Sequence, residues 1–141
     1  MPLDPSALSP ETCRVERVFR LRVELGPLDR AEDMREAVLS VTSLTWGDYD
    51  QVSFETEVGR QHYRTGPDAA GGPLPPETVP ARALSFSIPP ETAVLDRVLD
   101  AIQHAHSYEE PVIYVTESLA TRARPEITRS SPWKKWHRAD G

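Results

Sequence analysis

Residues 18–25 read VFRLRVEL, and from Phe19 to Leu25 apolar and charged side chains alternate without a break. Successive side chains of a β-strand point to opposite faces, so this alternation predicts a strand with one buried face and one solvated face. The buried set would be Phe19, Leu21, Val23 and Leu25. We take the strand Val18–Leu25 as the centre of the fold and place the other elements from it.

A helix is predicted directly after this strand. Gly26–Leu28 provides a turn, and Asp29 followed by Glu32 three residues later matches the capping box that opens many helices. One apolar stripe then runs along the helix: Ala31, Met34, Val38 and Val41. The helical pattern stops near residues 42 and 43.

The order of strand and helix then repeats. A turn at Trp46–Asp50 leads to a second alternating strand, Val52–Val58, and a third strand is predicted at Arg82–Ile88. Pro90 suits the first turn of a second helix. The apolar face of that helix carries Leu95, Val98, Ile102 and Ala105. A short fourth strand is expected at Val112–Thr116.

A long surface loop, Gly59–Pro80, is predicted between the second and third strands. Eight of the fifteen residues from 66 to 80 are Gly or Pro. Loops of this length in compact domains are usually functional or disordered.

The order of these elements predicts an α+β fold, a ferredoxin-like βαββαβ sandwich with two helices on one face of an antiparallel sheet. Right-handed crossovers bring Gly26–Asp29, Gly59–Pro80 and His106–Glu110 to one edge, and Gly47–Asp50 to the opposite edge. We expect a site within one subunit to lie at the shared edge.

Composition limits the classes of function. A chain of 141 residues suits one domain, and its single cysteine, Cys13, excludes a disulfide framework and a Cys-ligated metal cluster. Residues 1–117 carry 10 arginines against 20 acidic residues, which argues against nucleic-acid binding by this part. The chain has neither a long apolar stretch nor the features of a signal peptide, so we expect a cytoplasmic protein without a membrane span.

Three parts are expected along the chain: a flexible N-terminal segment, 1–14, a ferredoxin-like domain, 15–117, and a basic tail, 118–141. The tail holds six basic residues against two acidic ones, together with Trp133 and Trp136. Such a mixture suits stacking on bases or docking on an acidic partner, and packing of the tryptophans on the protein itself is the simpler interpretation.

The densest group of ligand-capable side chains is HAHSYEEP, residues 104–111. Imidazole nitrogens and carboxylate oxygens bind divalent first-row metals, so His106, Glu109 and Glu110 are candidate metal ligands, with His62 or His104 completing the set. The alternative is structural, with His106 capping the second helix and the two acids solvated.

Several motifs together resemble a known family. Their matching runs are Gly47–Asp50, Val52–Phe54, Gly59, His62–Arg64 and His106–Pro111. In this order they resemble the YqfO-like inserted domain of the NGG-one-interacting-factor family, over residues 15–117. The resemblance implies a fold similar to the CutA and PII signalling proteins, ferredoxin-like trimers that bind metal ions or small effectors near subunit boundaries. By the same analogy, the predicted loop looks like the mobile loop of a PII protein.

These observations lead us to expect a non-enzymatic, ligand-sensing or regulatory homotrimer that binds a divalent metal ion or a small anionic effector. Arg64 would neutralise an anion, and Tyr108 would position the ligands. A protein partner would contact Gly59–Pro80 or the C-terminal tail. Two alternatives stay open: a metal-dependent hydrolase that uses the same cluster, and a structural subunit of a larger complex.

Overall fold

The predicted central strand is present and is longer than the alternating stretch. In this computed structural model, which describes residues 3–129 and 131, β1 spans Cys13–Leu25. The other elements, in chain order, are η1 (Pro5–Ala7), α1 (Ala31–Leu39), β2 (Phe54–Glu55), β3 (Gly59–Tyr63), β4 (Glu77–Ile88), α2 (Thr92–Ala105), β5 (Ile113–Ala123) and α3 (Pro125–Thr128).

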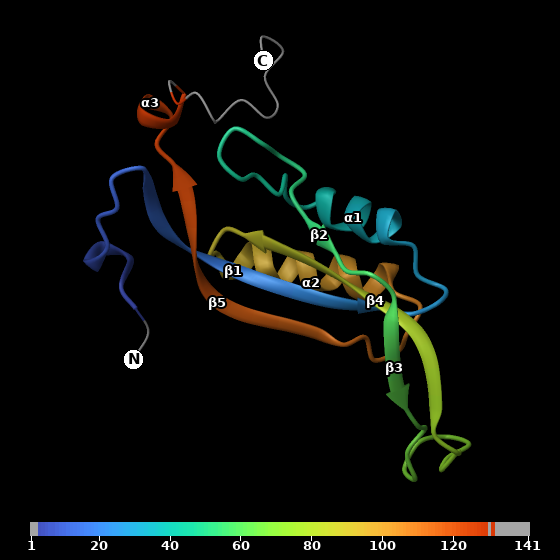
Figure 1. Ribbon diagram of the computed structural model, residues 1–141. Helices are drawn as coiled ribbons and strands as arrows, with labels where there is room; N and C mark the ends of the chain where they lie inside the picture. Colours follow the sequence, from blue (N-terminus) through green and yellow to red (C-terminus); the bar gives the residue numbers. More distant parts are fainter. Residues whose placement is uncertain (1–2, 130, 132–141) are drawn as a thin grey trace.

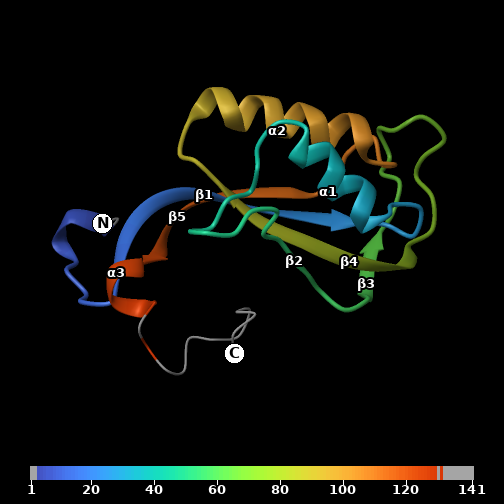
Figure 2. The same ribbon diagram turned by 90° about the horizontal axis from the view of Figure 1, so that it is seen from above.

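The sheet is antiparallel and has β1 near its middle. The strand order is β2-β4-β1-β5, and β3 pairs with the first part of β4 (Figure 1). The helices α1 and α2 contact each other and lie on one face of the sheet, as Figure 2 shows from above. This arrangement confirms the predicted ferredoxin-like α+β fold.

The core lies between the two helices and the sheet. The alternation in β1 is confirmed, because Leu21, Val23 and Leu25 have no exposed surface. The helices add four buried side chains: Met34 and Val38 from α1, and Val98 and Ile102 from α2. Burying one such side chain contributes roughly 1.5–3 kcal/mol. A shift of β1 by one residue would turn its apolar face to water, so the pattern fixes its register.

The predicted second strand, Val52–Val58, is wrong in its extent and in its buried face. Only Phe54–Glu55 forms β2, and Phe54 is 69% exposed. The backbone N–H of Thr56 donates to the carbonyl of Ala83 (2.9 Å), and its hydroxyl accepts the Ala83 N–H (2.8 Å). The pairing with β4 resumes with Gly59 opposite Ala81. Glu57 and Val58 therefore lie together opposite a single residue, Arg82. This β-bulge separates β2 from β3 along one edge of the sheet.

The predicted loop Gly59–Pro80 is largely a hairpin. β3 pairs in register with residues 77–81 of β4, so the connection is confined to residues 64–76. We call residues 59–81 the β3–β4 arm. The arm extends beyond the end of the sheet formed by β1 and β5 (Figure 1). Glycine and proline are therefore concentrated near the tip of an arm rather than spread through a structureless loop.

The fourth strand does not stop at Thr116 as predicted. β1 begins at Cys13, and its first five residues pair with Leu119–Ala123 at the end of β5. Both strands therefore run past the domain boundaries expected at residues 15 and 117, and the helix α3 follows β5. Trp133 and Trp136 lie outside the described residues. Among the helices that the structure describes, none is both long and apolar enough to cross a membrane.

Candidate functional site

Two turns distant in sequence meet at one end of the sheet. The turn between β1 and α1 contacts the turn between α2 and β5 through a partly buried group of hydrogen-bonded residues, which we call the turn cluster. Its members are Glu24, Gly26, Asp29, His106, Ser107 and Tyr108. The sequence-based expectation that Gly26–Asp29 and His106–Glu110 converge is confirmed.

Both ring nitrogens of His106 have partners within the chain. Nε2 donates to the backbone carbonyl of Glu24 (2.7 Å), and Nδ1 accepts the backbone N–H of Tyr108 (3.0 Å). A carbonyl only accepts and an amide N–H only donates, so these bonds select the tautomer that carries hydrogen on Nε2. The side chain has no exposed surface. His106 is also the residue that ends α2, as the structural alternative predicts.

Asp29 does not cap a helix, which corrects the capping-box prediction. Its Oδ2 accepts the Gly26 N–H (2.9 Å) and the Ser107 hydroxyl (2.9 Å), and its Oδ1 accepts the Ser107 N–H (2.8 Å). Arg30 stands at the start of α1 without a side-chain cap. Asp29 also lies 3.5 Å from Nδ1 of His106. The carboxylate therefore joins the two turns, a role that local spacing gives no means to predict.

Tyr108 covers the cluster. Its ring is tilted by 52° against the imidazole of His106, with 4.9 Å between ring centroids, and it lies against the backbone of Gly26. Burial, followed by the nearby charge of Asp29, raises the pKa of the Tyr108 hydroxyl above its ordinary value. The hydroxyl, which any tyrosine keeps protonated at neutral pH, thus holds its proton to a higher pH in the folded protein than in the unfolded chain.

The other predicted ligands are exposed. Glu109 and Glu110 follow Tyr108 with exposed side chains, and Arg64 is exposed just after β3. On the arm, Nδ1 of His62 lies 2.9 Å from the Thr78 hydroxyl oxygen. Within the described residues, no group of three or more His, Cys, Asp or Glu side chains is placed to hold a metal ion. The predicted metal ligands His62, His106, Glu109 and Glu110 therefore do not form a metal site in this structure. The metal prediction is supported only by the family resemblance.

The arm is joined to the turn cluster at its base. Nε2 of Gln61 in β3 donates to the Glu24 carboxylate (3.0 Å), and the Glu24 carbonyl accepts from His106. Figures 1 and 2 both place the arm and the α2–β5 turn at the same end of the molecule. The turn around Asp48 lies at the other end, where its carboxylate is 3.4 Å from Arg129. Both placements agree with the sequence analysis.

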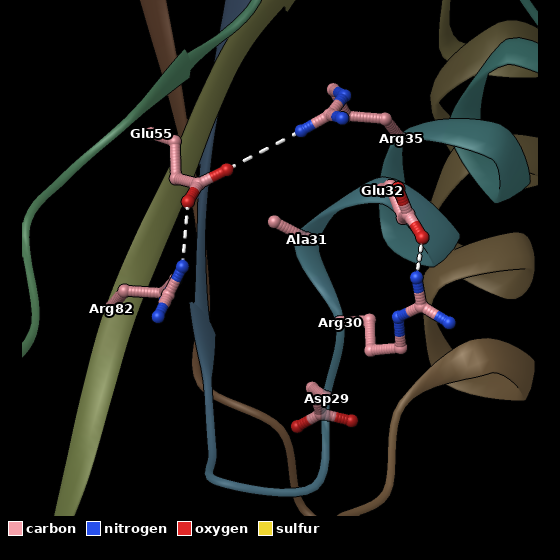
Figure 3. Close-up of a pocket in the computed structure, with 7 residues that line it drawn as sticks. All are labelled: Asp29, Arg30, Ala31, Glu32, Arg35, Glu55 and Arg82. Atoms are coloured by element: carbon pink, nitrogen blue, oxygen red, sulfur yellow. Dashed lines mark hydrogen bonds and ion pairs between the residues drawn. The ribbon is translucent and has the colours of Figure 1, made fainter.

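An open hollow of about 340 Å³ adjoins the cluster at the start of α1. Its lining residues are Asp29, Arg30, Ala31, Glu32, Arg35, Glu55 and Arg82. Figure 3 shows the Glu55 carboxylate between Arg35 (3.3 Å) and Arg82 (2.7 Å), while Arg30 pairs with Glu32. Each guanidinium has five N–H donors, so these pairs leave most of the donors open. Sequence reasoning missed this hollow, because its lining residues come from three separate segments: the start of α1, β2 and β4.

The fold is similar to that of a Bacillus cereus protein related to NIF3. The TM-score is 0.60 with 22% identical residues, and the match covers 77% of this chain and 27% of that chain. The chain therefore spans only 27% of the length of this relative. The resemblance inferred from the sequence motifs is confirmed at the level of the fold.

Two smaller proteins of similar fold are also known as structures. The periplasmic divalent cation tolerance protein CutA from Archaeoglobus fulgidus has a TM-score of 0.46 and 15% identity, covering 72% of this chain and 82% of that one. CPII from Thiomonas intermedia K12, a nitrogen regulatory PII-like protein bound to ADP, AMP and bicarbonate, has a TM-score of 0.49 and 11% identity, covering 79% and 100%. No protein-family model and no curated protein matches the chain.

Proposed function

We propose that this protein is a non-enzymatic regulatory protein of the PII/CutA-like kind. It acts as a homotrimer, binds a small effector at the end of the sheet that holds the turn cluster, and passes the bound state to a protein partner through the β3–β4 arm. The family resemblance suggests a regulatory protein of this kind, and the ferredoxin-like fold agrees with that suggestion. Fold alone does not assign a function, so the proposal depends on the site.

One observation carries the proposal: Glu24 contacts both the turn cluster and the arm. Its backbone carbonyl accepts from His106 (2.7 Å), and its carboxylate accepts from Gln61 (3.0 Å). A ligand that shifts the turn carrying Tyr108 acts on a bond to His106, and through Glu24 on the base of the arm. This is a physical route from a ligand to a projecting hairpin.

A small anion is the effector class that the charges favour. Arg30, Arg35 and Arg82 line the hollow beside Asp29, and Arg64 stands at the end of β3. Guanidinium groups match carboxylate, bicarbonate and phosphate oxygens in pairs. We propose Arg64 and Tyr108 as anion-contacting residues. A divalent ion held by Glu109, Glu110 and His62, with His106 released from its present bonds, is the alternative.

Calorimetric titration of the full chain tests the proposal. The probes are ADP, bicarbonate and inorganic phosphate for the anion, and zinc and manganese for the metal. We expect one of the anions to bind, and Arg64→Ala to weaken it about tenfold, the effect of losing one charge-assisted hydrogen bond. Arg97→Ala removes an exposed arginine from α2 and should leave binding unchanged. A chain that gives no heat with any of these probes contradicts the proposal.

The signalling step has its own readout. Binding should slow hydrogen exchange at the amides of β3, and Gln61→Ala should keep the binding but abolish this change. If the arm responds equally in Gln61→Ala, the route through Glu24 is wrong.

A further inference from the structure

Two arginines in the hollow beside α1 share a single carboxylate. Arg35 of α1 lies 3.3 Å from one oxygen of Glu55, and Arg82 of β4 lies 2.7 Å from the other (Figure 3). We call these two residues the arginine pair. Within the described residues, neither guanidinium is paired with a second acidic side chain. Two positive charges therefore face one negative charge.

The other acidic residues of the hollow have partners elsewhere. Glu32 pairs with Arg30, which precedes it in the chain. Both oxygens of Asp29 accept hydrogen bonds from Gly26 and Ser107, which belong to the two turns. Both carboxylates are thus satisfied by other groups, and the arginine pair is the part of the hollow with unbalanced charge.

The carboxylate between the arginines can leave without unfolding its strand. The side chain of Glu55 is 32% exposed, and ion pairs that water reaches in this way contribute little to stability. The backbone beside it is held independently, because Thr56 forms two hydrogen bonds with Ala83 of β4. Rotation of the Glu55 side chain into water therefore breaks no backbone hydrogen bond.

We infer that the arginine pair binds a small inorganic dianion of the phosphate class, and that Glu55 occupies this site until the dianion displaces it. The site goes beyond the proposed function, because neither Arg64 nor Tyr108 lines the hollow. Once Glu55 leaves, the two guanidiniums carry two positive charges, which a dianion balances and a single carboxylate does not. Guanidinium groups also bind phosphate oxygens in pairs.

The lining of the hollow favours a free inorganic anion over a nucleotide. Six of its seven residues are charged, and the seventh is Ala31. Proteins bind a nucleotide base on apolar or aromatic side chains, which these seven residues do not supply. Inorganic phosphate needs only the charges and N–H donors that the arginines offer.

Calorimetric titration with inorganic phosphate, in mildly alkaline buffer where phosphate is mostly doubly charged, tests the displacement. Glu55→Gln keeps the length of the side chain and removes the competing charge, so phosphate should bind about tenfold more tightly. Glu57→Gln makes the same change at an exposed position outside the hollow and should alter binding little. An ion pair with a purely structural role predicts no gain. Unchanged or weaker binding in Glu55→Gln overturns the inference.

Removal of an arginine tests the same site from the other side. Arg82→Ala should weaken phosphate binding more than about tenfold, because a charged donor is lost. In the Arg82→Ala background, Glu55→Gln should give no further gain, since both changes act on one site. A gain of the same size in both backgrounds places the phosphate elsewhere and overturns the inference.

Two other anions test the class of ligand. Bicarbonate carries one charge, so it should bind the arginine pair more weakly than phosphate. Equal affinities overturn the assignment to a dianion. ADP should bind this site no more tightly than phosphate, judged by the gain that Glu55→Gln produces. Tighter binding of ADP by this criterion overturns the assignment to a free inorganic anion.

A measurement on the wild-type chain decides the question if Glu55→Gln fails to fold. The side-chain carboxyl carbon of Glu55 and the Nε resonances of Arg35 and Arg82, followed by NMR, should shift together as phosphate is added. Saturation with phosphate that leaves all three unmoved overturns the inference.

The failure of this inference differs from the failure of the proposed function. If Arg64→Ala weakens anion binding while Glu55→Gln leaves it unchanged, the inference is wrong and the proposed function stands. If neither the wild-type chain nor Glu55→Gln gives heat with phosphate, bicarbonate or ADP, both the inference and the proposed anionic effector are wrong.

Discussion

The ring of Tyr108 lies against the backbone of Gly26 so closely that no room is left for a Cβ atom at that position. The two residues belong to different turns, and their contact closes the turn cluster over Asp29 and His106. Glycine is required here for close approach rather than for an unusual backbone angle.

Gly26→Ala should therefore destabilise the fold. The added methyl group must displace the Tyr108 ring, and overpacking of this kind costs about 1–3 kcal/mol in the free energy of unfolding. Urea denaturation measures the change. Gly66→Ala is the matched control, because a Cβ at Gly66 meets nothing within 4 Å. Equal stability of the two variants would contradict the described packing.

Asp29→Asn should separate the two turns while keeping the shape of the side chain. Asp29 accepts three hydrogen bonds through its two oxygens, whereas asparagine offers one oxygen. We expect a loss of about 1–3 kcal/mol in the free energy of unfolding, the penalty for leaving a buried donor unpaired. Asp68→Asn makes the same change at an exposed loop position and should have little effect. A capping role for Asp29 would instead predict local fraying of α1.

Stability should fall in alkaline solution. Burial and the charge of Asp29 raise the folded-state pKa of Tyr108 above the value of about 10 for an exposed tyrosine. The folded state thus holds the phenolic proton more tightly than the unfolded state. Its contribution is complete below pH 10 and is lost as the pH rises from 10 through the folded-state pKa. Tyr108→Phe should lose less stability over this range, and an identical loss in both proteins would contradict the assignment.

Arg122→Ala should weaken the opposite end of the sheet. The Arg122 guanidinium lies 4.2 Å from the centre of the Trp46 ring, and its Nε is 3.0 Å from the Glu16 carboxylate. Because Arg122 is only 8% exposed, we expect a loss of about 1–3 kcal/mol. Arg14→Ala breaks an exposed pair with the same Glu16 and should cost under about 0.5 kcal/mol. Urea denaturation followed by tryptophan fluorescence compares the two, and equal losses would count against the burial of Arg122.

The main elements could be predicted because local patterns match the buried faces. The alternation in β1 and the stripe containing Val98 and Ile102 both place apolar side chains in the core. Prediction failed where the partner strand decides the outcome. Alternation over Val52–Val58 suggests a half-buried strand, but the bulge opposite Arg82 interrupts it and leaves Val58 56% exposed.

From the sequence alone came the fold class, the end of the molecule where distant turns meet, and the importance of the run around His106. The spacing of apolar residues indicates these features, because side chains repeat on one face about every two residues in a strand and every 3.6 residues in a helix, and the buried face must be apolar. Only the tertiary structure decided that Asp29 joins the two turns and that Glu24 joins them to the arm. Those features depend on hydrogen bonds between residues 37 to 82 positions apart, such as Gln61 with Glu24 and His106 with Glu24, and local patterns carry no information about such partners.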